Sequence, residues 1–165
     1  MSLYRVKQFY WSLISKMDSK DKDFVENILN DNEKQLFNKL ATYEQKHCIN
    51  VAQDVLRICK EDEISNEVLI KVALLHDIGK VCKTLNPIEK SLMVMIDSIS
   101  KGKLKRLNSL KSVDVYYNHA EKGYNILKDI GNYNERFLYL IKNHHNNSIV
   151  GDRELDILKA CDSRN

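Results

Sequence analysis

The chain has 165 residues, of which 43% are hydrophobic and 30% are charged, and its formal net charge is +3. This length predicts a single soluble domain, and the composition excludes a disordered or low-complexity chain. With only one proline and five glycines, the chain lacks the repeated turn signals of an all-β fold, and so small a charge makes no strong case for nucleic-acid binding.

Apolar residues recur every three or four positions along most of the chain, which is the spacing of amphipathic helices. In the first part of the sequence this spacing predicts helices over residues 3–17, 22–30 and 33–42. We expect residues 1–40 to form N-terminal helices packed on a core domain of residues 41–165. The core begins with a strongly amphipathic helix over Gln45–Lys60.

The next predicted helix starts at a cap on Ser65 or Asn66 and continues to a stop near Gly79. After a loop at residues 84–87, residues 88–100 have helical spacing, whereas residues 101–112 are basic and have the weakest pattern in the chain. Further helices are predicted over 116–130, 134–143 and 154–161, with Gly131 as a stop and a polar turn at 144–151. The sequence therefore predicts one all-α domain.

The cysteines and the apolar runs indicate the compartment. Residues 1–16 contain no apolar core of a secretory signal, and no apolar run approaches the roughly 20 residues that span a bilayer. No Cys-x-x-Cys pair is present, which argues against a zinc ribbon. We expect a reduced, cytoplasmic protein with no membrane partner, in which the cysteines are small core residues: Cys48, Cys59, Cys82 and Cys161.

Every histidine lies within or at the end of a predicted helix: His47, His76, His119, His144 and His145. Neighbours such as His76 and Asp77 project about 100° apart on a regular helix, so both reach one ion only where the helix ends. Gly79 lets the chain leave at that point, and Lys80 then lies close enough to contact a phosphate oxygen. Imidazole and carboxylate together suit several divalent metals.

The run Ala-Leu-Leu-His-Asp-Ile-Gly-Lys over residues 73–80 resembles the HDIG subgroup of the HD superfamily of metal-dependent phosphohydrolases. That family has a histidine, a His-Asp pair and a late aspartate in this order, and the matching residues are His47, His76-Asp77 and Asp162. The resemblance extends over residues ~40–165. It implies a single-domain, HD-type helical bundle with a metal site between helices.

Binuclear members of that superfamily have two further histidine segments, and those around His119 and His144-His145 are similar to them. The resemblance implies two divalent ions, which the sequence cannot identify among Fe, Mn, Mg, Co, Ni and Zn. The first ion would be held by His47, His76, Asp77 and Asp162, and the second by His119, His144 and, as an open choice, His145, with Asp77 between the two.

The implied chemistry is hydrolysis of a nucleotide or another small phosphoester by a metal-activated water. Asp77 and Lys80 would be the catalytic residues: Asp77 orients the water and Lys80 holds the substrate phosphate. His145 has three readings, as a ligand after the helix unwinds, as a phosphate-binding group or as a solvated neighbour. Glu44, one turn before His47, is interpreted as a surface residue, and Glu121 and Gly123 as structural residues.

Two departures limit the substrate assignment. The Gly-Tyr-Pro motif of cyclic-dinucleotide phosphodiesterases is missing after His144-His145, and dinucleoside-tetraphosphate hydrolases have His-Thr at that place. The basic segment between Lys101 and Lys111 is either a solvated face or a phosphate-attracting rim, and Tyr116 and Tyr117 either stack a base or pack in the core.

Two other readings compete with an enzyme. One is a non-catalytic regulatory HD module that binds metal and nucleotide, and the other is a structural helical protein with incidental histidines. The sequence leaves the oligomeric state open.

Overall fold

The computed structural model describes residues 16–61, 67–85, 87–100 and 103–165. Within these ranges every regular element is a helix, which confirms the all-α fold. The helix predicted over residues 3–17 and the cap predicted at residues 65–66 lie outside the described residues, apart from the two last positions of that helix. The elements are α2 (Ser19–Ile28), α3 (Asp31–Phe37), α4 (Thr42–Glu61), α5 (Glu67–Leu75), the 3₁₀ helix η1 (Ile78–Cys82), α6 (Pro87–Ser100), the 3₁₀ helix η2 (Lys103–Leu107), α7 (Lys111–Ile130), α8 (Glu135–Asn143) and α9 (Arg153–Arg164).

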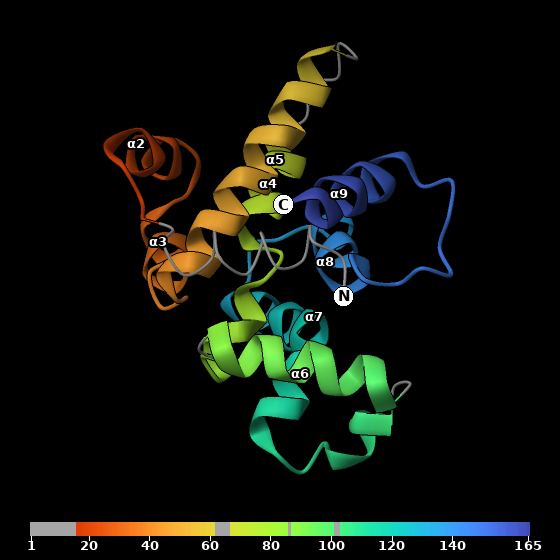
Figure 1. The fold of residues 1–165 in the computed structure, drawn as a ribbon. Helices are drawn as coiled ribbons and strands as arrows, with labels where there is room; N and C mark the ends of the chain where they lie inside the picture. Colours follow the sequence, from red (N-terminus) through yellow and green to blue (C-terminus); the bar gives the residue numbers. More distant parts are fainter. Residues whose placement is uncertain (1–15, 62–66, 86, 101–102) are drawn as a thin grey trace.

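The long helix α4 crosses the middle of the molecule and has other helices on each side (Figure 1). Helices α2 and α3 lie on one side of α4, α8 and α9 lie on the other, and α6 and α7 lie below in this view. Helix α4 packs on α5 and α9, and α7 packs on η1 and α8. None of the helices in the described part of the chain is long and apolar enough to span a bilayer.

Helix α5 is the most buried element, because apolar side chains cover nearly its whole circumference. Leu69, Val72, Leu74 and Leu75 are fully enclosed, and each such leucine or valine contributes roughly 1.5–3 kcal/mol through burial. As expected, Cys48, Cys59 and Cys161 are small core residues, whereas Cys82 is only partly buried; all four thiols are free. Because α5 is buried, the residues that follow Leu75 also lie in the interior of the protein.

Side-chain caps fix the starts of several helices. Asp18 and Asn30 form capping boxes with Asp21 and Glu33 at the starts of α2 and α3, and Asn134 and Asp152 cap α8 and α9. Each cap satisfies backbone N–H groups that have no partner inside the helix. The α2–α3 segment is tied to the rest of the molecule by ion pairs, such as Asp21 with Lys46 at 2.7 Å, while a domain boundary at residue 40 stays a prediction.

Several predicted boundaries were wrong. Helix α5 ends at Leu75, four residues earlier than predicted, and a 3₁₀ turn replaces its last part. Pro87 was predicted in a loop but begins α6, a position that tolerates its missing N–H. Helix α7 begins five residues early because Val113 and Val115 are buried, and η2 forms within the weakly patterned basic segment.

Candidate metal centre

Asp77 lies in the turn between α5 and η1, where the chain has left the helix. Its backbone angles, φ −94° and ψ 7°, fall between the helical and extended regions. The turn places its carboxylate among three imidazoles: Oδ2 lies 3.5 Å from Nε2 of His76 and 3.7 Å from Nε2 of His47, and Oδ1 lies 3.3 Å from Nε2 of His119. The helix end therefore lets His76 and Asp77 face one point, as the sequence predicted.

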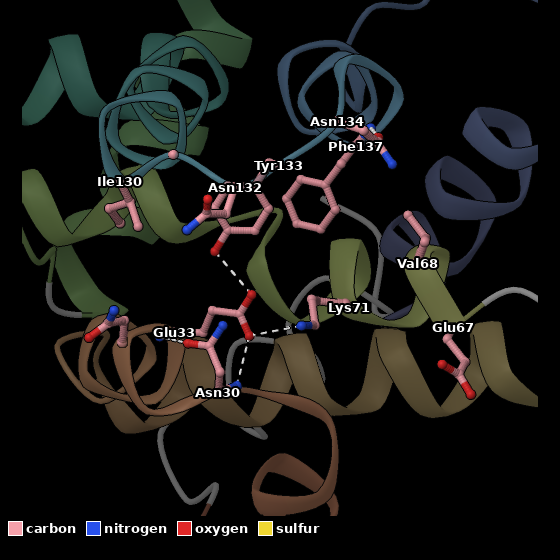
Figure 2. Close-up of a pocket in the computed structure, with 12 residues that line it drawn as sticks. Asn30, Glu33, Glu67, Val68, Lys71, Ile130, Asn132, Tyr133, Asn134 and Phe137 are labelled. Carbon is pink, nitrogen blue, oxygen red and sulfur yellow. Dashed lines mark hydrogen bonds and ion pairs between the residues drawn. The ribbon is translucent and has the colours of Figure 1, made fainter.

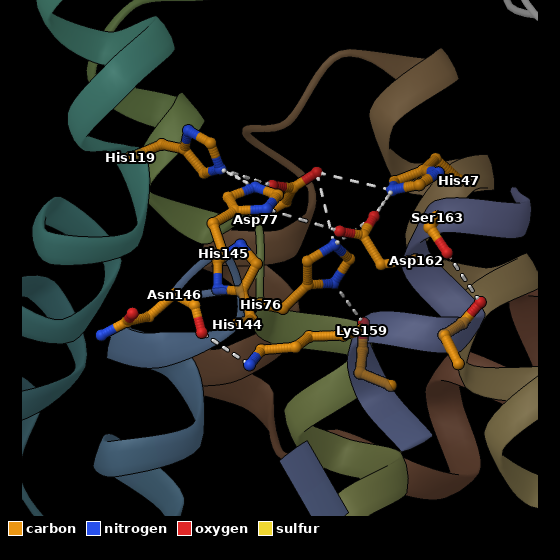
Figure 3. Close-up of polar contacts among 12 residues, drawn as sticks. His47, His76, Asp77, His119, His144, His145, Asn146, Lys159, Asp162 and Ser163 are labelled. Atoms are coloured by element: carbon orange, nitrogen blue, oxygen red, sulfur yellow. Dashed lines mark hydrogen bonds and ion pairs between the residues drawn. The ribbon is translucent and has the colours of Figure 1, made fainter. Parts of the chain in front are cut away.

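One group of donor atoms comes from α4, the turn after α5, and α9. Nε2 of His47 lies 3.0 Å from Oδ1 of Asp162, and Nε2 of His76 lies 3.6 Å from the same oxygen. One donor atom from each of these three residues lies within 4.8 Å of the others. Figure 3 shows the three side chains converging beside Asp77.

A second group of donor atoms comes from α7 and the end of α8. It includes Asp77, which also lies beside the first group. Nε2 of His145 lies 2.9 Å from Nε2 of His119, and the rings of His144 and His145 are 4.1 Å apart between centroids. Donor atoms of Asp77, His119, His144 and His145 lie within 4.8 Å of one another. The structure therefore gathers all of the predicted metal-binding residues in one cluster (Figure 3).

Three buried histidines of the cluster are oriented in the same way by their own helices. Nδ1 of His76 lies 2.8 Å from the carbonyl oxygen of Ala73. Nδ1 of His119 lies 3.1 Å from the carbonyl oxygen of Tyr116, and Nδ1 of His144 lies 2.7 Å from that of Ile141. A carbonyl only accepts, so each Nδ1 carries a proton and donates. Nε2 is thereby directed into the cluster, in the orientation that a neighbouring acceptor gives a metal-ligating histidine.

The cluster contains buried polar atoms that nothing in the described part of the chain satisfies. They are Nε2 of His76, Nε2 of His144 and Oδ1 of Asp77. Each such atom costs about 1–3 kcal/mol if it stays without a partner. Divalent cations bound among these imidazoles and carboxylates would satisfy all three, so the residues present fit a metal centre.

The charge states of His119, His144 and Asp77 are those of metal ligands. Burial lowers the pKa of His119 to about 4 and that of His144 well below its usual range, so both rings are neutral. Burial opposes the charge of Asp77, but Lys80 and the surrounding histidines hold its pKa well below the usual range. For His76, burial would lower the pKa, yet the charge of Asp77 raises it, so a cation that binds this ring displaces a proton.

Helix α7 packs against the turn after α5 at two glycines, Gly79 and Gly123. A Cβ on Gly79 would lie 1.9 Å from the carbonyl oxygen of His119 and 2.7 Å from the backbone nitrogen of Gly123. Only a residue without a side chain allows two backbones to approach this closely. The sequence predicted Gly79 as a stop and Gly123 as structural, but not that the two meet.

Comparison with known families agrees with this geometry. The family model named HD domain matches residues 45–164, which include the whole cluster. This chain belongs to the HD domain family. The HD family is one of metal-dependent phosphohydrolases, and HD domains bind divalent metals. No curated protein and no solved structure gives a significant match to the chain, and membership of the HDIG subgroup stays a prediction.

In this HD domain, Lys80 bridges two carboxylates. Its Nζ lies 2.5 Å from Oδ2 of Asp77 and 2.9 Å from Oε2 of Glu44. Burial would lower the pKa of Lys80, but the two carboxylates raise it well above its usual range, so the side chain stays charged. The predicted contact of Lys80 with a substrate phosphate stays a prediction.

The interpretation of Glu44 as a surface residue was wrong, because the residue is only 4% exposed. Glu44 precedes His47 by three residues on α4, and residues at this spacing share a helix face. A buried carboxylate on that face needs a cation, and Lys80 supplies it. That spacing could have indicated that Glu44 faces the interior, but it does not point to Lys80, 36 positions later.

His144 and His145 both face the cluster at the end of α8. Helix α8 ends at Asn143, and its C-cap, His144, keeps helical backbone angles (φ −61°, ψ −19°). Lys159, on α9, donates from Nζ to the carbonyl oxygens of Asn146 at 2.6 Å and Ile149 at 2.8 Å. This contact, which the sequence did not predict, fixes the loop beside His145, whose side chain is 51% exposed at the edge of the cluster.

The basic segment and the tyrosine rings make their described contacts away from the cluster, although the backbone carbonyl of Tyr116 accepts from His119. Helix η2 packs on α6 and α7. Tyr116 and Tyr117 pack edge to face at 4.9 Å, and the hydroxyl of Tyr117 donates to Asp97. Of the two roles that the sequence left open, stacking on a base or packing, the structure therefore displays packing for Tyr117.

A pocket of about 340 Å³ lies at the start of α5, beside Glu67 and Val68 (Figure 2). His76 follows the other end of this helix. Its buried carboxylate, Glu33, already has partners: Nζ of Lys71 at 3.0 Å, the hydroxyl of Tyr133 at 3.0 Å and the backbone N–H of Asn30 at 2.8 Å. This closed network joins α3 to α5 and to the α7–α8 connection. No residue of the metal cluster lines the pocket.

Proposed function

We propose that this HD domain hydrolyses a nucleotide or another small phosphoester, using water activated by two divalent metal ions. The observation that carries the proposal is a pair of neighbouring donor groups, one of His47, His76 and Asp162 and the other of Asp77, His119, His144 and His145. Asp77 also lies beside the first group, 3.5 Å from His76 and 3.7 Å from His47. Each group offers at least three nitrogen or oxygen donors, which is enough to hold one ion while leaving positions for water and substrate.

Residues beside the proposed ions have separate roles in the reaction. When bound, two such ions supply an activated water and positive charge for the phosphate oxygens. Asp77 lies between both groups and orients the water by accepting its hydrogen bond. Lys80 adds a fixed positive charge beside Asp77, and the exposed edge of His145 marks the side from which a phosphate enters.

A nucleophilic side chain is not part of this proposal. Cys48 lies beside His76 and Asp77, but burial raises the pKa of its thiol, and the thiol form is a poor nucleophile. Direct attack of water on phosphorus therefore fits the described residues better than a covalent intermediate. The partner is a small phosphorylated molecule rather than a polymer.

The decisive experiment combines metal analysis with turnover. The purified protein is loaded with Mn, Fe, Co, Ni, Zn or Mg, its metal content is measured, and phosphate release is followed on a panel of nucleotides and dinucleotides. We expect two ions per chain and release of phosphate, and loss of both in D77N. The matched control is D54N, because Asp54 carries the same charge on α4 but pairs with exposed Arg57.

Two results would count against the proposal. Metal uptake without turnover on the whole panel would favour the regulatory module that binds metal and nucleotide. A protein that takes up none of these metals would overturn both readings.

A further inference from the structure

Exposed large hydrophobic side chains are concentrated in one part of the described chain. Of nine such residues, six lie between positions 92 and 110: Leu92, Met95, Ile96, Ile99, Leu107 and Leu110. Isolated exposed apolar residues are ordinary, but a cluster of them marks a contact surface. This cluster lies outside the metal centre and has no part in the proposed hydrolysis.

Four of these residues form a stripe along α6. Positions 92, 95, 96 and 99 have the spacing of one helix face. Asp97 projects to the opposite side, where it accepts a hydrogen bond from the hydroxyl of Tyr117 on α7. The stripe therefore points away from the protein, and Ile99 is 75% exposed.

The segment that follows α6 is basic and interleaved with leucines. Lys103, Lys105, Arg106 and Lys111 are exposed, and residues 101–112 contain no acidic residue. Leu104 is buried and anchors η2, which packs on both α6 and α7. The stripe and the cations consequently belong to the same end of the molecule, at the bottom of Figure 1.

We propose that this end of the molecule binds the surface of a bilayer that contains anionic phospholipid. We call it the α6–η2 surface, formed by Leu92, Met95, Ile96, Ile99, Lys103, Lys105, Arg106, Leu107, Leu110 and Lys111. An apolar helix face beside lysines and arginines is typical of helices that lie in the membrane interface. The apolar groups enter the boundary of the acyl chains while the cations contact lipid phosphates.

Other occupants fit this surface less well. A two-fold interface between copies of the chain would bring two cationic segments together, and like charges across an interface are unfavourable. A nucleic acid would use the cations but leave the apolar stripe in water. Only an anionic amphiphilic surface matches both features. The sequence-based expectation of no membrane partner rested on the lack of an apolar run long enough to span a bilayer, and contact of this kind needs no spanning helix.

Vesicle sedimentation of the full chain tests the proposal. We expect binding to vesicles that mix phosphatidylcholine with phosphatidylglycerol, weaker binding as salt is raised, and negligible binding to phosphatidylcholine alone. K105E/R106E and I96N/I99N should each weaken binding by about tenfold or more, because each removes one half of the recognition. The control is K20E/K22E, which makes the same charge change at exposed lysines on α2.

The outcomes separate the alternatives. Equal binding by the control and both surface variants would overturn the proposal, as would equal binding to the two kinds of vesicle. Binding that K105E/R106E loses but I96N/I99N keeps would indicate a polyanion site instead, and loss of self-association in I96N/I99N without any vesicle binding would indicate a second copy. Circular dichroism of each variant establishes that it is folded.

Discussion

Gly79 and Gly123 meet backbone to backbone, so that the carbonyl oxygen of His119 occupies the place that a side chain on Gly79 would need. Asp77 lies two residues before one glycine, and His119 lies four residues before the other. The glycine contact therefore sets the 3.3 Å separation between Oδ1 of Asp77 and Nε2 of His119. A packing contact of two residues without side chains thus determines the geometry of two proposed metal ligands.

Gly79→Ala should be severely destabilising. The added methyl group would lie 1.9 Å from a backbone oxygen, and a backbone cannot give way as a flexible side chain can. We expect a loss of about 3 kcal/mol or more in the free energy of unfolding. Gly123→Ala is the comparison, since its Cβ would be 3.2 Å from the nearest atom, and it should lose less. Urea unfolding in the presence of chelator measures both, and a wild-type midpoint for Gly79→Ala would contradict this account.

Glu44 and Lys80 should behave as a coupled buried pair. Glu44→Ala would leave Lys80 paired with Asp77, so we expect a loss smaller than the about 3–5 kcal/mol that follows when a buried charge is left with no partner. Lys80→Met should also destabilise, and the double variant should lose less than the two single losses added together, by roughly 1 kcal/mol or more. Unfolding with chelator present keeps metal binding out of the comparison. Additive losses would show that the two residues act independently.

Lys159→Met should weaken binding of the second metal ion. The ammonium group holds the loop after His145 through the carbonyl oxygens of Asn146 and Ile149. Removing a group that orients a ligand typically lowers metal affinity 10–100-fold, and we expect about tenfold here because the contact is to the loop. Competition with a chelator measures the affinity. Lys142→Met, which removes a lysine paired with exposed Glu121 on the surface, should leave it unchanged.

The pair of Asp152 and Arg136 should give the fold a pH dependence in acid. Hydrogen bonds from Arg136 are the largest cause that lowers the pKa of Asp152, to about 2. The unfolded carboxyl has a pKa of about 3.9, so the pair stabilises the fold fully above that value. This stability is lost as the pH falls towards about 2.

Arg136 is 41% exposed, so water and salt screen the pair, and we expect about 1 kcal/mol from it. Asp152→Asn keeps the cap of α9 but removes the charge. Between about pH 4 and pH 2, its free energy of unfolding should therefore decline less steeply than that of the wild type in chelator-containing urea titrations. Parallel declines would show that Asp152 does not titrate at low pH.

The parts of the fold that follow from local pattern were predictable from the sequence. Helical spacing located α4, α7 and α8, and the order of the histidines and aspartates indicated which side chains gather. The end of α5 at Leu75 was harder to predict, because the apolar pattern continues through Ile78. That residue is buried from a 3₁₀ turn instead of from a helix.

What the sequence did not reveal depends on pairs of residues far apart in the chain. The burial of Glu44 follows from Lys80, which lies 36 positions later. The role of Lys159 depends on carbonyl groups, which every residue has and which leave no trace in the pattern of side chains. The contact of Gly79 with Gly123 leaves no periodic pattern in the sequence, because it requires only that both residues lack a side chain.

The cluster draws on helices that are remote from each other in chain order. His47 belongs to α4 and Asp162 to α9, the last helix that the structure describes, and α9 packs on α4, α5 and α8. A growing polypeptide cannot assemble the first of the two proposed ion sites until α9 has docked. Because an ion that binds only the completed site stabilises it by mass action, chelation should speed amide hydrogen exchange in α9 above all. Metal supply would then govern the maturation and lifetime of the protein as well as the proposed catalysis.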